Sequence, residues 1–240
     1  MTPRRSRRVA RDFQVVIMAK APTPGAVKTR LCPPLTHGQA AGLAQAALLD
    51  TLDAVAASGA RRRVLAIDGA LGPWVPPGFD VIGQRTGAFG SRLAGAVDDA
   101  WSTVPVPVLV VGMDTPQLQG SDLDGAAGAL LGDGPAGNRP STVLGPAEDG
   151  GYWAIGTRRP VPGMFEGVPM STDQTGAAQL SRLRALGVPC TVLGAMRDVD
   201  EFADAQAVAE LAPDTRFAAT LRSMLGGVPA PAPLTTAIRS

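Results

Sequence analysis

Several residues that could bind phosphate are gathered in a short segment directly after the first apolar run of the chain. The segment reads Lys-Ala-Pro-Thr-Pro-Gly-Ala-Val-Lys-Thr-Arg-Leu, and its candidates are Lys20, Gly25, Lys28, Thr29 and Arg30. The lysines supply positive charge, the guanidinium can contact two phosphate oxygens at once, and a glycine lets the backbone come close to a ligand. The pattern predicts a phosphate-binding loop.

An aspartate follows the clearest buried run of the sequence. The run covers Val106–Gly112, and Asp114 comes next, in a turn that Pro116 stiffens. A carboxylate at the exit of a central strand is well placed to bind a hard divalent cation, which would bridge the protein to the phosphates of a nucleotide. A turn-forming aspartate is the alternative. Because another strand end carries the basic loop, we favour a metal ligand.

A third group combines carboxylates, glycines and aromatic residues. It consists of Glu148, Asp149, Gly150, Gly151 and Tyr152, followed by a tryptophan. The glycines permit a close backbone approach to a ligand, and the aromatic rings can pack on a base, a sugar or an acceptor. Asp-Gly-Gly is also an ordinary hairpin turn. Either carboxylate could serve as a base or hold the acceptor, and both roles stay open.

Two alternating aspartates follow the last apolar run of the sheet. In an extended segment Asp198 and Asp200 point to the same side, so both could face a cleft. Asp200 is the candidate second metal ligand beside Asp114, since charge neutralisation dominates phosphate chemistry, and Asp149 stays open as the alternative. The alternative is a cap on a helix that begins at Glu201.

A glycine-rich turn leads into another helix. Arg92 would lie in the first turn of this helix, where anions are attracted, and Gln84 could contact the edge of a base. The single histidine, His37, is more typical of a surface position, and one histidine gives no basis for a Ser-His-Asp set. The two cysteines, Cys32 and Cys190, lie far apart in sequence and argue against a disulfide framework, and together with the single histidine they argue against a zinc site.

Strand-like and helix-like runs alternate along the chain, and this alternation must position the groups above. Strands are expected at Phe13–Ala19, Arg63–Asp68, Asp80–Gly83, Val106–Gly112, Thr142–Gly145, Tyr152–Ile155 and Thr191–Leu193. Helices are expected at Gln39–Ala57 with Thr36 as cap, at Phe89–Trp101, from a Ser121 cap to Leu131, from a Thr172 or Asp173 cap to Leu186, at Glu201–Leu211 and at Thr215–Leu225. The pattern predicts an α/β fold with a mainly parallel central sheet and helices on both faces. Nucleotides bind at the carboxyl edge of such sheets.

The composition is that of a globular protein. The 240 residues are 45% hydrophobic and 18% charged, and 22 basic against 21 acidic residues leave a net charge of +1, which favours neither nucleic acid nor an anionic membrane as partner. No apolar run approaches the length of a membrane span, and we expect a cytoplasmic protein.

We expect a basic disordered arm at residues 1–12, one domain at 13–226 and a proline-rich tail at 227–240. The Gly/Pro-rich interval Gly132–Pro140 is too short to separate two domains. The oligomeric state stays open.

Taken together, the motifs resemble the DUF2064 family, whose members are also labelled rSAM/selenodomain-associated transferases or arsenosugar-biosynthesis glycosyltransferases. The resemblance runs from about Val15 to Leu211. It implies a GT-A (Rossmann-like) α/β/α sandwich of the nucleotide-diphospho-sugar transferase superfamily, and the basic loop is also similar to that of 2-phospholactate guanylyltransferases. By that resemblance Lys20, Lys28 and Arg30 hold phosphates, Asp114 and Asp200 hold Mg²⁺ or Mn²⁺, and residues 149–152 line the acceptor side.

Three functions follow from these features. The leading expectation is a magnesium-dependent nucleotidyltransferase, in which Lys28, Asp114 and Asp149 take part in catalysis and pyrophosphate leaves. It would join a nucleoside monophosphate from a nucleoside triphosphate to a small phosphorylated or carboxylated acceptor. The alternative is a GT-A glycosyltransferase with a nucleotide-diphospho-sugar donor, which stays open because Gly25 is the loop's only glycine. A nucleotide-binding module without turnover is the third.

Overall fold

Seven strands form one mixed sheet in a computed structural model that describes residues 11–132 and 141–226. In sheet order they are β3 (Asp80–Gly83), β2 (Ala60–Asp68), β1 (Arg11–Lys20), β4 (Val108–Val111), β6 (Tyr152–Thr157), β5 (Thr142–Pro146) and β7 (Cys190–Val192). Only β6 runs antiparallel to its neighbours among these strands. The predicted mainly parallel α/β sheet is confirmed.

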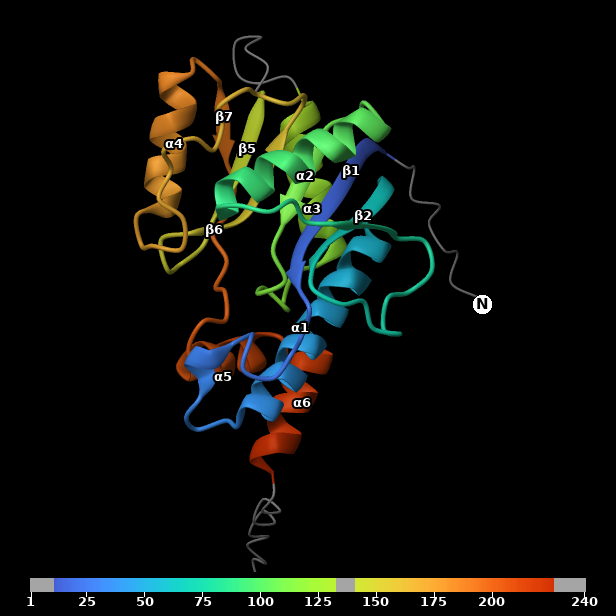
Figure 1. The fold of residues 1–240 in the computed structure, drawn as a ribbon, viewed down its shortest axis with the longest axis vertical. Helices are drawn as coiled ribbons and strands as arrows, with labels where there is room; N and C mark the ends of the chain where they lie inside the picture. The colour runs from blue at the N-terminus through green and yellow to red at the C-terminus, as the bar shows by residue number, and fades with distance from the viewer. Residues whose placement is uncertain (1–10, 133–140, 227–240) are drawn as a thin grey trace, which may run out of the picture.

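Helices cover both faces of the sheet (Figure 1). They are α1 (His37–Ala57), α2 (Phe89–Thr103), α3 (Gly120–Leu131), α4 (Thr175–Ala185), α5 (Phe202–Leu211) and α6 (Arg216–Leu225), with a short 3₁₀ helix η1 (Thr29–Leu31). Side chains alternate along β1, so Val15 and Ile17 pack with α1 and α3, whereas Val16 and Met18 pack with α2 and α4. Two apolar cores therefore enclose the sheet, which is the predicted α/β/α sandwich.

A third core lies beyond the edge of the sheet. There α5 and α6 pack beside the first half of α1, below the sheet in Figure 1. The carboxylate of Asp50, buried on α1, accepts hydrogen bonds from the backbone N–H groups of Arg216 (3.0 Å) and Phe217 (2.8 Å). It thereby caps the start of α6, and burial raises its pKa. This cap fixes the α5–α6 pair to the rest of the fold.

The helix α1 serves two of these cores at once. It has 21 residues and a mean hydropathy of 1.2, which by length and composition alone would suit a membrane span. Two thirds of its most apolar stretch is buried against the sheet and α6. The apolar composition of α1 is therefore that of a core helix. The expected cap Thr36 is confirmed, since it forms a capping box with Gln39.

Two other predicted helix caps were wrong, and the alternative role of Asp200 as a helix cap is not observed. The helix α3 begins at Gly120 rather than after Ser121, because the N–H of Gln119 donates to the Asp122 carboxylate (2.8 Å). The helix α4 begins at Thr175, with Gln174 rather than Thr172 or Asp173 at the cap position. The helix α5 begins at Phe202, and Asp204 supplies the carboxylate that Asp200 would have supplied.

Two strands also differ from the prediction. The strand β1 begins at Arg11, whereas the prediction placed Arg11 and Asp12 in a disordered arm. The Asp12 carboxylate forms an ion pair with Arg61 (2.9 Å). The strand β4 is shorter than the predicted Val106–Gly112, because pairing with β1 is confined to Val108–Val111. Residues 1–10, the interval 133–140 and the tail 227–240 lie outside the described residues.

Candidate active site

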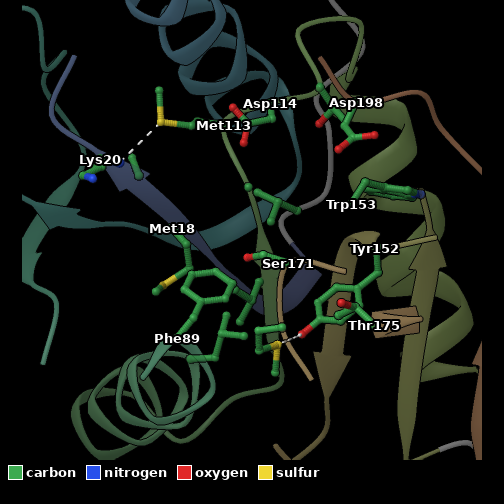
Figure 2. A pocket seen from close by; sticks show the side chains of 18 of the residues that line it. Met18, Lys20, Phe89, Met113, Asp114, Tyr152, Trp153, Ser171, Thr175 and Asp198 are labelled. Carbon is green, nitrogen blue, oxygen red and sulfur yellow. Dashed lines mark hydrogen bonds between the residues drawn. The ribbon is translucent and has the colours of Figure 1, made fainter. Parts of the chain in front are cut away.

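A cleft of about 440 Å³ opens where the carboxyl ends of β1, β2 and β4 meet the start of β6 (Figure 2). Each of these elements contributes a polar side chain to its rim. They are Lys20 at the end of β1, Asp68 at the end of β2, Asp114 after β4 and Asp149 before β6. A smaller cavity of about 330 Å³ adjoins it on the side of the basic loop, where Val27, Thr29 and Arg30 form the wall. The predicted phosphate loop and the predicted carboxylates therefore lie at one site.

Two cations of the loop face these cavities. The Lys20 side chain is exposed and makes no ion pair within the described part of the chain, so its charge is free for a ligand. The Arg30 side chain is 68% exposed and lies 3.2 Å from an Asp200 oxygen. Gly25 adopts φ +77°, and nothing within 4 Å occupies the position of a Cβ. Gly25 lines neither cavity, so its glycine serves the turn of the loop rather than a close approach to a ligand.

Lys28 makes contacts that the sequence does not predict. Its ammonium nitrogen lies 2.7 Å from Asp114 Oδ1 and 3.6 Å from Asp200 Oδ1, and it donates to the carbonyl oxygen of Val199. Only 10% of the side chain is exposed, and the backbone has a left-handed φ of +50°. The charge of Lys28 is therefore committed to protein groups, and the prediction that it grips phosphate is not supported by this geometry.

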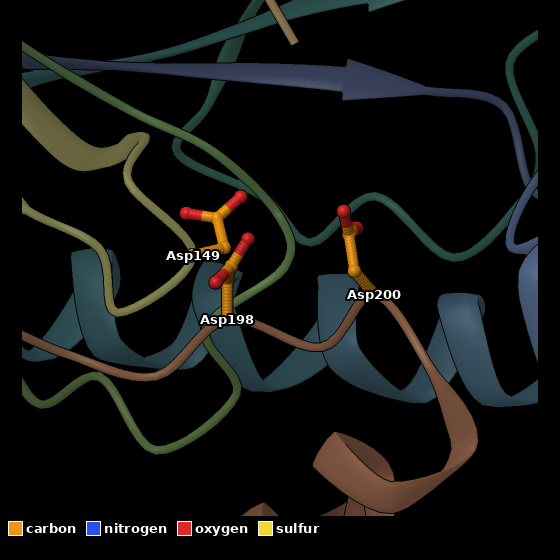
Figure 3. A group of neighbouring side chains, drawn as sticks. All are labelled: Asp149, Asp198 and Asp200. Atoms are coloured by element: carbon orange, nitrogen blue, oxygen red, sulfur yellow. The ribbon is translucent and has the colours of Figure 1, made fainter. Parts of the chain in front are cut away.

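Three aspartates approach one another closely enough to share a cation (Figure 3). They are Asp149, Asp198 and Asp200, each of which has a carboxylate oxygen within 4.8 Å of those of the other two. Carboxylate oxygens are the ligands that Mg²⁺ and related hard cations prefer, so this donor set fits such an ion. Burial raises the pKa of Asp198 to about 6, and the negative charges of Asp149 and Asp200 act in the same direction.

The predicted ligand pair was Asp114 with Asp200, and the structure brings together a different set. Asp114 stands outside the three-aspartate group and is paired with Lys28, although it still lines the cleft with a side chain that is 43% exposed. The group also contains Asp198, which was not among the predicted metal ligands. The alternation of side chains in an extended segment had placed Asp198 on the same side as Asp200.

A buried valine holds the two neighbouring aspartates in place. Val199 is 1% exposed and packs in the core of α5 and α6. Its N–H donates to the carbonyl oxygen of Asp114 (2.9 Å), and its own carbonyl accepts from Lys28. With Val199 turned inward, Asp198 and Asp200 turn toward the cleft, as the alternation in the sequence predicts.

The turn between β5 and β6 holds Asp149. Its Oδ1 accepts a hydrogen bond from the N–H of Gly151 (2.7 Å), and Gly150 has a φ of +90°. A Cβ on Gly150 would meet the carbonyl oxygen of Asp173 at 2.0 Å. This glycine therefore allows the turn to pack against the start of α4. Gly150 does not line the cleft, so the geometry gives no support to its predicted contact with a ligand.

Glu148, from the same turn, faces away from the cleft. Its carboxylate pairs with Arg197 (2.8 Å) and lines neither of the two cavities. Of the two carboxylates that could have contacted an acceptor, only Asp149 is placed to do so.

The two aromatic residues that follow have different environments. Trp153 is 5% exposed and donates from Nε1 to the carbonyl oxygen of Gly194 (2.9 Å), so its ring belongs mainly to the core rather than to a stacking surface. Tyr152 is half-buried and lines the cleft, with its hydroxyl 3.8 Å from the sulfur of Met170. Burial raises the pKa of Tyr152, which keeps the phenol neutral.

Gln84 and Arg92 line the cleft but are already paired. Gln84 donates from Nε2 to the carbonyl oxygens of Ala19 (2.8 Å) and Ala66 (2.9 Å). Arg92 donates from Nη1 to Asp68 (3.0 Å) and to the amide oxygen of Gln84 (2.9 Å). The side chain of Gln84 therefore joins β1 to β2, and its amide hydrogens are not free for the predicted contact with a base.

Two further residues of the site carried no signal in the sequence. Ser171 lines both cavities and is, with Lys28, one of the two non-glycine residues with positive φ in the described ranges. Thr115 is 2% exposed and lines the cleft, and its hydroxyl has no hydrogen-bond partner in the described part of the chain. Strained backbone and unpaired buried hydroxyls concentrate at functional sites, so both support the location of this one.

Solved structures with the same fold bind or are named for nucleotides. A candidate nucleotide-diphospho-sugar transferase from Desulfovibrio desulfuricans G20 is 22% identical, with a TM-score of 0.79 over 90% of this chain and 96% of that one. The CMP:2-keto-3-deoxy-manno-octonic acid synthetase complexed with CTP is 15% identical, with a TM-score of 0.52 over 84% and 98% of the two chains. A cytidylyltransferase from Leptospira borgpetersenii serovar Hardjo-bovis is 11% identical, with a TM-score of 0.53 over 90% and 94%. At these identities the likeness establishes the fold, which is the predicted GT-A-like one.

A comparison with sequence families is more specific. No curated protein matches the sequence. The model of a family described as uncharacterised proteins conserved in bacteria, DUF2064, matches residues 43–172, which is more than half of the chain. The matched range includes Asp68, Asp114 and Asp149 of the cleft. The chain belongs to the DUF2064 family.

Proposed function

We propose that this protein is a nucleotidyltransferase that uses a divalent cation, Mg²⁺ or Mn²⁺. It transfers a nucleoside monophosphate from a nucleoside triphosphate to a small phosphorylated or carboxylated acceptor and releases pyrophosphate. The observation that carries the proposal is the position of an unpaired cation, Lys20, across one cleft from Asp149, Asp198 and Asp200. Such a cleft offers positive charge to phosphates and carboxylates to their counter-ion.

The phosphates of the donor fit the side of the cleft that the basic loop forms. Lys20 and Arg30 are the cations available there, and they line both the cleft and the smaller cavity. A triphosphate carries more negative charge than the diphosphate of a nucleotide-sugar, so two cations in addition to a metal favour the triphosphate. In this proposal Lys20 and Arg30 hold the pyrophosphate that leaves.

The carboxylate group fits the cation that phosphate transfer requires. Asp149, Asp198 and Asp200 would hold it, with Asp114 at the edge of the same site. When bound, the metal supplies neutralisation of the charge on the phosphate oxygens. Lys28 keeps Asp114 and Asp200 in position and lowers the repulsion among the aspartates while no cation is bound.

Orientation and charge account for most of the rate in such reactions, so the protein needs no nucleophile of its own. The acceptor's oxygen has to lie in line with the leaving group, on the side of the cleft opposite Lys20. Asp149 and Tyr152 line that side. We assign them to the binding of the acceptor, with Asp149 shared between the acceptor and the metal.

Thermal stabilisation of the purified protein tests the proposal directly. Each nucleoside triphosphate and each common nucleotide-sugar is added with and without MgCl₂, and pyrophosphate release is followed with candidate acceptors. Stabilisation by a triphosphate that requires the cation supports the proposal and identifies the base. Stabilisation by a nucleotide-sugar alone, or by neither ligand, contradicts it.

The second candidate is a glycosyltransferase with a nucleotide-diphospho-sugar donor. It is favoured by the fold likeness to the structure from Desulfovibrio desulfuricans, whose description names that class. Here Asp149 would accept the proton of an acceptor hydroxyl. Sugar transfer without pyrophosphate release distinguishes this reaction from the first. Nucleotide binding that needs no cation and leads to no turnover would instead indicate a binding module.

A further inference from the structure

The cleft does not end at its charged rim but continues into the apolar core between the sheet and the helices α2 and α4. Six side chains form this inner part, which we call the apolar chamber: Met18, Phe89, Leu93, Val110, Ile155 and Met170. All six belong to the same hydrophobic core on that face of the sheet. Figure 2 shows Met18 and Phe89 at one end of the cleft and Asp114 and Asp198 at the other.

The apolar chamber is a gap in a core that would otherwise be closed. Protein interiors are packed as densely as organic crystals, so a cleft of about 440 Å³ that enters a core leaves apolar walls without partner atoms. Met18, Leu93, Val110 and Ile155 are each at most 6% exposed, so these walls belong to the core and present only a small part of their surface to the cleft. A ligand that fills the gap with carbon atoms would gain the burial energy that the core lacks.

Most polar groups near the apolar chamber are already paired. The Thr175 hydroxyl donates to the carbonyl oxygen of Pro169 (2.8 Å), and both amide hydrogens of Gln84 go to main-chain carbonyls. Arg92 is held by Asp68 and Gln84. The Tyr152 hydroxyl has a weak partner, the sulfur of Met170 at 3.8 Å, and two buried donors of the cleft, Arg92 Nε and the Thr115 hydroxyl, have no partner among the described residues.

This inventory disfavours a polyhydroxylated group in the apolar chamber. Several sugar hydroxyls would give up their hydrogen bonds to water and find few replacements, which costs more than their carbon atoms gain. The ring nitrogens and exocyclic groups of a nucleobase would meet the same shortage.

We propose that the apolar chamber holds an alkyl or aryl portion of the acceptor, so that the second substrate is an amphipathic phosphate or carboxylate rather than a free sugar phosphate. This inference rests on the proposed function, since it places the charged head of the acceptor at the rim with the cations and carboxylates. It names the substrate class that the transferase accepts.

The probes are the n-alkyl phosphates from ethyl to hexyl, with erythritol 4-phosphate as a polyhydroxylated compound of similar size to butyl phosphate. Their affinities for the full-length protein are measured by calorimetry in the presence of MgCl₂. Each added methylene is expected to tighten binding about threefold to fourfold, with an increasingly negative heat-capacity change. Butyl phosphate is expected to bind at least about tenfold more tightly than erythritol 4-phosphate.

Two variants assign the effect to the apolar chamber. Met18→Gln, which keeps the length of the side chain and adds an amide, should abolish the chain-length dependence. Met164→Gln changes a methionine of the same core that does not line the cleft and should retain the dependence, which separates the loss from a general effect on folding.

The outcomes separate this inference from the proposed function. Affinity that does not change with chain length, or equal binding of erythritol 4-phosphate, overturns the inference. So does displacement of hexyl phosphate by a nucleoside, which would place the base in the apolar chamber. Binding of a triphosphate with Mg²⁺ but of no alkyl phosphate overturns the inference and leaves the proposed function standing. A chain-length trend without any nucleotide binding overturns the proposed function alone.

Discussion

The ammonium nitrogen of Lys28 lies 2.7 Å from Oδ1 of Asp114, although the two residues are separated by three strands and two helices in sequence. The same nitrogen contacts Asp200 and the carbonyl of Val199, so one lysine joins the loop after β1, the turn after β4 and the segment before α5. A lysine that lies in a basic loop thus holds together the acidic side of the cleft.

Replacing Lys28 with methionine should destabilise the protein without a cation and make it more responsive to one. Removal of one partner leaves partly buried carboxylates without their counter-charge, and we expect the free energy of unfolding to fall by about 2 kcal/mol. MgCl₂ should raise the melting temperature of this variant more than that of the wild type, since the ion replaces the lost charge. An equal response of the two proteins to MgCl₂ would show that the lysine and the metal act at separate places.

Lys20→Met, in contrast to the Lys28 variant, should leave the stability of the protein unchanged and weaken the binding of nucleotide. The side chain is exposed and makes no ion pair among the described residues, so the melting temperature should change by no more than about 1 °C. The affinity for a nucleoside triphosphate should fall about tenfold or more, because a charge-assisted contact to phosphate is lost. Titration calorimetry with and without MgCl₂ measures this. Unchanged affinity would remove Lys20 from the binding site.

Asp198→Asn should stabilise the protein at neutral pH while it loses the cation. The pKa of Asp198 is raised to about 6 in the folded state from an ordinary 3.8, so the folded state binds the proton more tightly than the unfolded chain. Stability therefore falls as the pH rises from about 4 to about 6, and the asparagine variant escapes this loss. At pH 7.5 we expect a gain of roughly 1 kcal/mol, after allowance for solvent screening, or about 2–4 °C in melting temperature.

The difference between the Asp198→Asn variant and the wild type should vanish near pH 4, and MgCl₂ should no longer raise its melting temperature. Cation affinity of the wild type should increase as the pH rises through about 6 for the same reason. Asp99→Asn, at an ion pair with Arg85 away from the cleft, is the matched control and should show neither effect. A variant that keeps full Mg²⁺ binding would exclude Asp198 as a ligand.

Gly150→Ala should disturb the cleft indirectly, by displacing the β5–β6 turn that holds Asp149. The added Cβ would lie 2.0 Å from the carbonyl oxygen of Asp173, so the β5–β6 turn and the start of α4 have to separate. We expect a loss of more than about 2 kcal/mol in unfolding free energy and weaker cation binding, because Asp149 moves with the turn. Gly167→Ala has a similar φ of +70° with open space around it and should show only the backbone strain, about 1 kcal/mol. Chemical denaturation of both variants compares them.

The sheet and its layers could be predicted because they depend on local patterns. Continuous Val/Leu runs indicated buried strands such as β4, and alternation placed Asp198 and Asp200 on one side of their segment. The positions of Asp114 and Asp149 at the carboxyl edge followed from the order of the elements. The helix caps were harder, since Gln119 and Glu201 precede helices whose capping carboxylates lie within the first turn.

The partners of the charged residues could not be predicted. A lysine among prolines suits a phosphate as well as it suits a carboxylate, and Lys28 meets residues more than 80 positions away only after the chain folds. Gln84 likewise has the chemistry to contact a base, but two main-chain carbonyls of β1 and β2 take its amide hydrogens. Residue type indicates which chemistry is possible, and long-range packing decides which partner is met.

The burial of Val199 between α1, α5 and α6 means that the site can be lost under conditions in which the sheet stays folded. The two aspartates on either side of Val199 keep their places only while the last two helices remain docked, whereas the sheet has cores of its own. Local opening of these helices would disperse the proposed cation ligands at a lower free energy than global unfolding requires. Inactivating substitutions in this protein can therefore lie at Phe217 or Leu221, far from any ligand, and leave the spectroscopic signature of the folded sheet unchanged.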